Sequence, residues 1–333
     1  MTAPSFASLT TLRVGGTPAV AYECTTAEEL AETVAKLDRD QSPLLVVGGG
    51  SNLVVADGDL DLAAVLVRNE GISLIDDLRL RAQAGTEWDA VVAYAVEHGL
   101  GGIEALSGIP GSAGATPVQN VGAYGAEIAD VLTRVRLYNR ETGADEWVPA
   151  SSLDLAYRYS NLKFTSRAVV LEIELQLERT DESIPLRHLG GARVPLAQAR
   201  ESVLETRRAK GMVLDASDHD TWSAGSFFTN PVVPSALADE IAAHVGEDAM
   251  PRFSAGDGKE KLSAAWLIER AGCHRGFPGD DAPARLSTKH TLALTNRGNA
   301  RAADIVDLAR RVQAQVRDAF GVDLHPEPVW VGL

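Results

Sequence analysis

Two glycine-rich loops have the residue types and spacing that most directly suggest binding chemistry in this chain. One runs from Gly99 to Gly125 and carries eight glycines, and the other is the GGGSN segment from Gly48 to Asn52. Glycine permits positive φ and close main-chain approach, so successive N–H groups in such loops can converge on a phosphate. Two such loops indicate a ligand with two phosphates and a long body, although tight irregular turns have the same composition.

A dinucleotide site of the Rossmann type does not fit the GGGSN loop, which comes first in the chain and is called the first glycine loop below; Gly99 to Gly125 is the second. That site needs G-x-G-x-x-G after a strand and at the start of a helix. After Asn52 the chain continues with Leu53-Val54-Val55, a β-branched apolar run. The loop is therefore predicted to join two strands, and the phosphates would meet loop amides with no helix dipole behind them.

Arg158 and Lys210 are candidate cations for an anionic ligand. Arg158 lies between two tyrosines in the segment AYRYSN, where a guanidinium can hold a carboxylate in bidentate fashion. Taken alone, an ordinary surface arginine stacked on tyrosine fits this segment as well. Lys210 ends a basic patch that starts at Arg207. Lys210 could place a charge at a phosphate or tune a hydroxyl, and a solvated helix end is the alternative.

Ser226 and Glu327 are candidates for proton transfer. Ser226 lies between a glycine and two phenylalanines, so we expect its hydroxyl in a partly apolar pocket. The G-x-S-x-G pattern of hydrolases is absent, and a loop-capping serine is the alternative. Prolines on both sides of Glu327 fix φ and present the carboxyl group on a rigid segment. In an apolar neighbourhood this acid can donate a proton, whereas a solvated acid near the C-terminus is the alternative.

Length and charge exclude several classes of protein. The 333 residues predict about two domains, and the formal net charge of -15 without a basic stripe argues against nucleic-acid or anionic-membrane partners. No apolar run approaches bilayer length and the N-terminus lacks a signal pattern, so we expect a cytoplasmic protein. Cys24 and Cys273 lack zinc spacing, and the histidines form no ligand cluster, so we expect reduced cysteines and no metal.

Strands in the first half and helices in the second must position these residues. Alternating apolar segments predict strands at 19–23, 64–67, 72–75, 78–84, 132–139, 146–149 and 168–177. A capping box that begins at Thr25 predicts a helix to about Leu37, and Thr86 is predicted to cap a helix that ends at Gly99. Helical periodicity predicts further helices at 194–210, 261–271 and 301–320. A domain boundary is expected between 180 and 194.

A set of collinear segments makes the chain resemble the UDP-N-acetylenolpyruvoylglucosamine reductase family. These segments are GGGSN, GIPGSAGATPVQNVGAYG, YRYS, GSFFTNP, KLSAAWLIERAG and HPEPVW. The resemblance covers nearly the whole chain and implies an α+β fold, with a two-subdomain FAD-binding unit of the vanillyl-alcohol-oxidase type plus a smaller α+β substrate domain. It implies an FAD-binding domain at 1–190, split near residue 65, and a substrate-binding domain at 191–333 whose last residues return to the active-site cleft.

The resemblance also implies an activity. It is the NADPH-dependent reduction of UDP-N-acetylenolpyruvoylglucosamine to UDP-N-acetylmuramate through noncovalent FAD, in cytoplasmic peptidoglycan precursor synthesis, by an expected monomer. Catalytic roles are implied for Arg158, Ser226 and Glu327, with Lys210 as the neighbour that polarises the serine. Substrate contacts are implied for Tyr124, Lys210, Asn230 and His290. Cofactor contacts are implied for Gly48, Gly49, Gly50, Ser51, Asn52, Ile109, Pro110, Gly111, Ser112, Gly114, Ala115, Gln119, Asn120, Gly122 and Ala123.

Two positions depart from the family pattern. Where relatives carry a tyrosine on the loop over the uridine, this chain offers His188, and where relatives have a glutamine before the last strand it has His290. Two other functions are open: another FAD oxidase or dehydrogenase on the same scaffold, and a non-catalytic nucleotide-sugar sensor. The joint presence of Arg158, Ser226 and Glu327 argues against the sensor.

Overall fold

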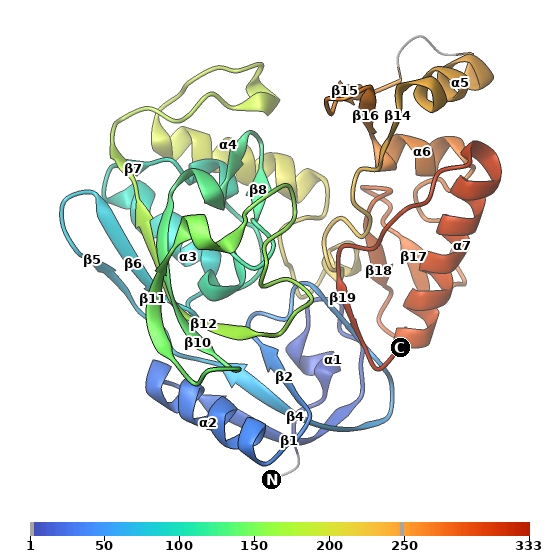
Figure 1. Ribbon diagram of the computed structural model, residues 1–333. Helices are drawn as coiled ribbons and strands as arrows, with labels where there is room; N and C mark the ends of the chain where they lie inside the picture. The colour runs from blue at the N-terminus through green and yellow to red at the C-terminus, as the bar shows by residue number, and fades with distance from the viewer. Residues whose placement is uncertain (1–2, 247–249) are drawn as a thin grey trace. The chain divides into compact units, whose positions relative to one another are not determined.

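The computed structural model describes residues 3–246 and 250–333, which form two compact units (Figure 1). Unit 1 comprises the chain up to Thr10, Gly16–Ser51 and Gly58–Leu214, and unit 2 comprises Thr11–Gly15, Asn52–Asp57 and Asp215–Leu333. The chain thus divides at 214, not at the expected 190. The physical reason is α4 (Leu196–Ala209), whose apolar side chains Ala199 and Leu204 are buried in unit 1.

A parallel three-stranded sheet and one helix form the first layer of unit 1. The strand order is β1-β4-β2, with β1 at Thr17–Cys24, β4 at Asp59–Val67 and β2 at Leu44–Val47. Helix α2 (Ala27–Arg39) packs its apolar stripe on this sheet, beside β1 and β4 in Figure 1. Thr26 caps α2 by accepting a hydrogen bond from the Glu29 amide at 3.1 Å, so the predicted capped helix is confirmed.

An antiparallel five-stranded sheet forms the larger layer of unit 1. Its order is β11-β10-β12-β6-β5. The strands are β5 (Ile72–Leu74), β6 (Arg79–Gln83), β10 (Leu132–Asn139), β11 (Asp145–Pro149) and β12 (Ala168–Gln176). One face buries its alternating apolar side chains under α3 (Trp88–Glu97) and α4. All the strands predicted in this region are confirmed. Thr86 does not cap α3, because its hydroxyl bonds both backbone groups of Gly71 instead.

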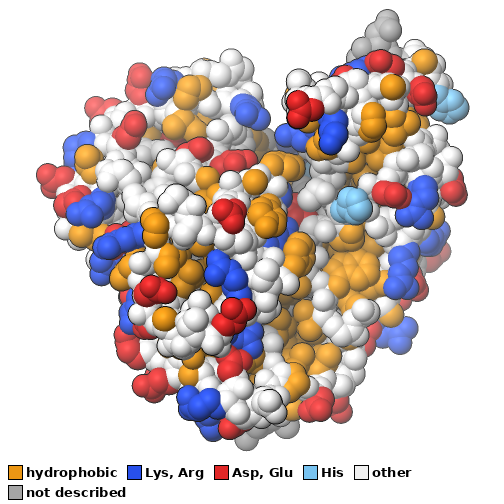
Figure 2. All heavy atoms as spheres, in the orientation of Figure 1, with side chains coloured by type: hydrophobic (Ala, Val, Ile, Leu, Met, Phe, Trp, Pro, Cys, Tyr) orange, Lys and Arg blue, Asp and Glu red, His pale blue; other side chains and the backbone are white. Residues whose placement is uncertain are grey.

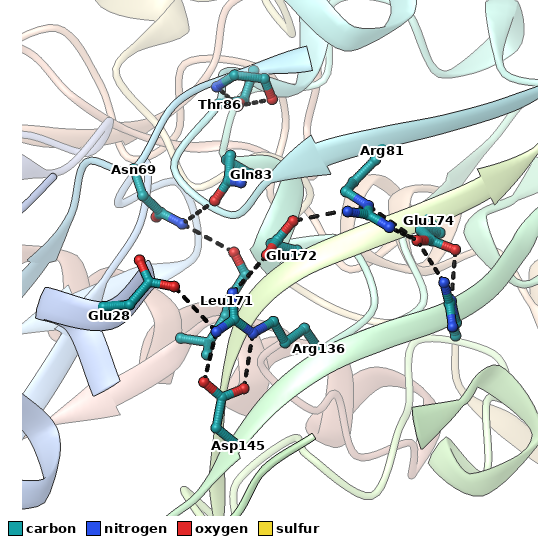
Figure 3. Close-up of polar contacts among 12 residues, drawn as sticks. Glu28, Asn69, Arg81, Gln83, Thr86, Arg136, Asp145, Leu171, Glu172 and Glu174 are labelled. Atoms are coloured by element: carbon teal, nitrogen blue, oxygen red, sulfur yellow. Dashed lines mark hydrogen bonds and ion pairs between the residues drawn. The ribbon is translucent and has the colours of Figure 1, made fainter. Parts of the chain in front are cut away.

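The opposite face of this sheet carries a ladder of arginines and glutamates (Figure 3). Glu174 on β12 is only 1% exposed and accepts hydrogen bonds from Arg81 and Arg134 on the two neighbouring strands, the shortest at 2.6 Å each. Both guanidinium groups also lie over the ring of Trp147, at 5.0 and 4.7 Å from its centre. Burial by itself raises the pKa of Glu174, but the two arginines outweigh it and hold that pKa below its usual range.

Replacing Glu174 by glutamine will destabilise the protein in a pH-dependent way. Because the folded pKa lies below the unfolded value of about 4.3, the carboxylate contributes its full stabilisation above that value and loses it as the pH falls through the folded pKa. The arginines are partly exposed, so we expect a loss of about 1–3 kcal/mol at pH 7. Urea unfolding should show this loss at pH 7 and a smaller one at pH 3. The control Glu146→Gln, on the exposed part of β11, should leave the free energy of unfolding unchanged at both pH values.

The described part of unit 2 combines small sheets with three helices. Strand β3 (Leu53–Val55) pairs with β19 (Val329–Val331), and β17 (Ala284–Leu286) pairs with β18 (Leu294–Asn296). A third sheet contains β14 (Val232–Pro234), β15 (Arg252–Ser254) and β16 (Lys259–Leu262). Helices α5 (Ser235–Val245), α6 (Ala264–Arg270) and α7 (Ala302–Phe320) enclose one apolar core with them. The helix predicted from residue 261 begins only at Ala264, because 259–262 pair as β16 and Ser263 caps α6.

The surface carries both signs of charge. Figure 2 shows lysine and arginine side chains interspersed with aspartate and glutamate over the face displayed, with no single-sign stripe. Cys24 and Cys273 are both buried and unbridged, as predicted. Among residues 3–246 and 250–333, no helix combines the length and the apolar character needed to cross a membrane.

Candidate active site

The two glycine-rich loops pack against each other within unit 1. A methyl group added to Gly49 would lie 2.7 Å from the Cα atom of Gly111, and one added to Gly111, where φ is +130°, would lie 2.8 Å from the hydroxyl of Ser51. A methyl group on Gly48 would overlap the hydroxyl of Ser112. Only glycine permits an approach this close, so the spacing of the glycines brings the two loops together.

The amides of these loops are available to a ligand. In the described part of the chain, no hydrogen bond uses the backbone N–H of Gly49, Gly50, Ser51, Gly111 or Ser112. The first loop follows β2 and precedes β3, so the predicted strand-to-strand connection is confirmed. Five unused donors in two touching loops fit a pyrophosphate held by main-chain groups.

Adding a side chain at Gly49 should weaken the binding of FAD, the cofactor that the family resemblance implies. In Gly49→Ala the methyl group overlaps the main chain of Gly111, so the loops must separate and their amides lose their common geometry. We expect the Kd for FAD to rise at least about 10-fold, or 1.4 kcal/mol, in titrations of the FAD-free protein followed by flavin fluorescence. Gly321→Ala strains a helix end in unit 2 without touching any atom within 4 Å. It should lower stability and leave FAD affinity unchanged.

Arg158 is built into unit 1 in a strained conformation. Its φ is +54°, in the left-handed region that non-glycine residues seldom occupy, and its Nη2 donates to the Gly122 carbonyl at 2.6 Å. The ring of Tyr157 lies 5.2 Å from the guanidinium carbon, and Lys163 Nζ donates to the Arg158 carbonyl at 3.2 Å. The hydrogen bond to Gly122 and the positive φ favour a functional arginine, whereas the contact with Tyr157 also fits the alternative of a surface arginine stacked on tyrosine.

Asn120 holds the segment before Tyr124 in place. Its side-chain amide donates to the Glu127 carboxylate at 2.8 Å and to the Ala156 carbonyl at 3.0 Å, and its carbonyl accepts from the Ala129 amide at 3.1 Å. Asn120 also has positive φ, at +47°, and is buried. Asn120 is one of the predicted cofactor contacts, and the hydrogen bonds of its side chain are made to other protein groups. Three further predicted cofactor contacts, Gln119, Gly122 and Ala123, are half-buried.

Tyr124, His188 and Lys210 form a cluster from three segments of unit 1. The rings of Tyr124 and His188 meet edge to face at 4.8 Å, and Lys210 Nζ lies 6.0 Å from the centre of the Tyr124 ring. His188 Nε2 bonds the Ser202 hydroxyl on α4 at 3.0 Å. Burial lowers the pKa of His188, and the charge of Lys210 lowers it further. The structure thus places His188, which departs from the family pattern, beside two predicted substrate contacts.

Ser226 and Glu327 lie on neighbouring segments of unit 2. The Glu327 amide donates to the Phe227 carbonyl at 2.9 Å, and Phe228 forms an isolated antiparallel bridge with Pro326. Both phenylalanine rings are buried, whereas Ser226 and Glu327 are half-buried. The hydroxyl and the carboxyl group therefore come from two segments that are about 100 residues apart and hydrogen-bonded side by side.

The end of the first glycine loop anchors Glu327. Asn52 Nδ2 donates to the Glu327 carbonyl at 3.4 Å, and the Asn52 carbonyl accepts from the Val329 amide at 2.9 Å, where β3 pairs with β19. This pairing argues against a solvated acid on a frayed chain end. It also gives Asn52, a predicted cofactor contact, a structural role in unit 2.

Asn230 and His290 occupy built positions in unit 2. The Asn230 side-chain carbonyl accepts from the Ala264 amide at 3.0 Å and so binds the start of α6. The His290 amide donates to the Ser287 hydroxyl at 3.3 Å, in a turn whose Thr288 is held by the Asp220 carboxylate at 2.6 Å. Burial by itself raises the pKa of Asp220, but its hydrogen bonds, those from Thr288 foremost, hold it low. Asp220 was not predicted, because nothing in the sequence links it to a loop about 70 residues away.

Comparisons with known proteins agree with this architecture. The family model described as the C-terminal domain of UDP-N-acetylenolpyruvoylglucosamine reductase matches residues 216–331, and an FAD binding domain model matches 18–144. UDP-N-acetylenolpyruvoylglucosamine reductase 2 of Corynebacterium glutamicum is 61% identical over 99% of this chain and 93% of its own. The chain belongs to the UDP-N-acetylenolpyruvoylglucosamine reductase family. The reductase of Corynebacterium diphtheriae is 59% identical over 99% of this chain and 90% of its own.

A solved structure extends the agreement to the fold. UDP-N-acetylenolpyruvylglucosamine reductase from Thermus caldophilus matches with a TM-score of 0.69 at 25% identity, covering 98% of this chain and 97% of that one. The predicted fold class, an α+β two-subdomain FAD-binding unit with a smaller α+β domain, is thereby confirmed. The protein is an FAD-dependent oxidoreductase with NADPH as the reductant. Both touching glycine loops lie within residues 18–144, which match the FAD binding domain.

Proposed function

We propose that this reductase converts UDP-N-acetylenolpyruvoylglucosamine to UDP-N-acetylmuramate with NADPH, as a cytoplasmic monomer in peptidoglycan precursor synthesis. Family membership at 61% identity supports the reaction. The observation from the structure that carries the proposal is the pair of touching loops around Gly49 and Gly111, whose unused amides suit a pyrophosphate. FAD, when bound, supplies the hydride that reduces the enolpyruvyl double bond.

The roles proposed for three side chains follow from the charge that this reduction creates. Hydride addition at C3 places negative charge on C2, and the charge spreads into the carboxylate. Arg158 would bind that carboxylate, since its guanidinium is a permanent cation held by the Gly122 carbonyl. Glu327, as a neutral acid, would donate a hydrogen bond to the developing enolate. Ser226 would deliver the proton to C2, which completes the saturated lactyl ether.

The nucleotide would be held by other residues. Tyr124, Lys210, Asn230 and His290 are proposed to contact the substrate. His188 lies against Tyr124 and is proposed to take the place of the loop tyrosine of relatives. The proposed cofactor contacts are Gly48, Gly49, Gly50, Ser51, Asn52, Ile109, Pro110, Gly111, Ser112, Gly114, Ala115, Gln119, Asn120, Gly122 and Ala123.

One anaerobic experiment tests the proposal. The purified protein should be yellow and release free FAD on denaturation, and NADPH should bleach its flavin band. Adding UDP-N-acetylenolpyruvoylglucosamine should then restore the band with one equivalent of UDP-N-acetylmuramate formed. An oxidase on the same scaffold would instead recover its band only in air. A nucleotide-sugar sensor would bind the sugar nucleotide with the flavin still reduced, and a protein unable to bind FAD would overturn the assignment altogether.

A further inference from the structure

Arg207 is a half-buried cation whose place in the fold differs from that of its exposed neighbours in the basic patch. It lies in the last turn of α4, where its Nη2 donates to the Met212 carbonyl at 2.7 Å. Its Nε is shielded from solvent and, within residues 3–246 and 250–333, has no hydrogen-bond partner. Arg208 is 54% exposed and pairs with Glu201, and Lys210 is exposed. The predicted solvated helix end therefore describes Arg208 and Lys210 but not Arg207.

Asp89, the carboxylate whose charge acts on Arg207, is already paired with Arg200. Asp89 accepts two hydrogen bonds from Arg200, both at 2.7 Å, and a third from the Gly108 amide at 2.6 Å. Arg207 makes no ion pair with it among the salt bridges of the described residues. Burial of an arginine without its own counterion is costly, and here it lowers the pKa of Arg207 even though Tyr124 and Asp89 act in the opposite direction.

Arg207 lies between the second glycine loop and the Tyr124 cluster. A methyl group on Gly108 would lie 3.6 Å from the Arg207 Nε. On the other side the charge of Arg207 acts on the Tyr124 phenol, over whose ring Lys210 Nζ also lies, at 6.0 Å. The charge of Arg200 neutralises that of Asp89. Arg207 and Lys210 therefore contribute two positive charges that this pair does not balance. A site with two uncompensated positive charges is suited to a ligand with two negative charges.

We propose that the half-buried Arg207 is a counter-charge for the diphosphate of the bound sugar nucleotide, acting together with Lys210 beside Tyr124. This inference rests on the proposed function, because it takes the sugar nucleotide as the ligand of the Tyr124 cluster. An arginine suits the position, since its guanidinium stays charged where a lysine can lose its proton on burial. Arg207 acts as a binding residue for an anion and takes no part in hydride or proton transfer.

The test compares Arg207→Met with Arg208→Met in the FAD-loaded, oxidised protein. Both variants remove one positive charge from the same turn of α4, but Arg207 is half-buried with a shielded Nε, whereas Arg208 is exposed. Binding of UDP-N-acetylmuramate, UDP-N-acetylglucosamine and uridine is followed by calorimetry. We expect Arg207→Met to raise the Kd of both UDP-sugars by about 10- to 100-fold and to leave uridine binding within about 2-fold. Arg208→Met should bind all three like the wild type, and Arg207→Lys should restore part of the lost affinity.

The remaining outcomes separate this inference from its alternatives. A loss of affinity for UDP-N-acetylmuramate alone would mean that Arg207 binds the carboxylate of that ligand. This result would overturn the proposed diphosphate role. Loss of FAD from Arg207→Met, with UDP-sugar affinity retained in the reconstituted protein, would assign it to the cofactor. Equal weakening for uridine, or a large fall in the thermal midpoint without ligand, would mean a structural arginine. If the wild type binds no UDP-sugar, the proposed function itself fails.

Discussion

Replacing Ser226 by alanine will slow the reoxidation of reduced flavin by UDP-N-acetylenolpyruvoylglucosamine by roughly 10²- to 10⁴-fold, the usual range for a lost general acid. Reduction of the flavin by NADPH will stay within about 2-fold of the wild-type rate, because hydride arrival needs no proton from this hydroxyl. The fold should tolerate the change, since the segment is held by the Phe227 amide and carbonyl and not by the serine side chain. Anaerobic stopped-flow absorbance measures the two half-reactions separately.

A cysteine at the same position distinguishes the proton donor from a packing role. Ser226→Cys keeps an ionisable proton on nearly the same side-chain shape, so it should recover part of the rate that Ser226→Ala loses. If Ser226 were a loop-capping serine, both half-reactions would slow together and the melting temperature would fall. That pattern would remove Ser226 from the chemistry.

Replacing Glu327 will separate hydrogen bonding from proton delivery. If Glu327 donates a hydrogen bond to the developing enolate, Glu327→Ala will slow substrate reduction by roughly 10²- to 10³-fold, the range for a lost oxyanion donor. Glu327→Gln will retain more of the rate, because the amide can still donate. Affinity for the substrate should change less than the rate, since the interaction strengthens as charge develops. Single-turnover flavin reoxidation across a range of substrate concentrations measures both quantities.

Two results would contradict this role for Glu327. Equal impairment in the Gln and Ala variants would point to proton delivery instead, and wild-type reoxidation in both would leave Glu327 without a part in the reaction. Asp323→Asn is the matched control, because Asp323 is an exposed acid of the same C-terminal segment that pairs only with Arg317 among the described ion pairs. It should react at the wild-type rate.

Local pattern was sufficient for most elements of unit 1. Strand β6 alternates buried and half-buried residues with a period of two, β12 is buried along nearly its whole length, and α2 begins at a capping threonine. The prediction failed at Thr86, whose hydroxyl found a partner in the distant Gly71 and so did not cap the next helix. Caps depend on nearest neighbours, but any tertiary hydrogen bond can displace them.

For the candidate site, the sequence by itself determined which residue types could bind and react. It placed glycines, which permit positive φ, at Gly49 and Gly111, and it placed prolines, which fix φ, beside Glu327. These backbone properties hold in any fold. Only the tertiary structure decided which residues meet. It brought Gly49 against Gly111 and Asn52 against Glu327, 275 positions away. It also shielded the Nε of Arg207 while leaving the Arg208 side chain exposed, because burial depends on what packs over a helix turn and not on the residue types within that turn.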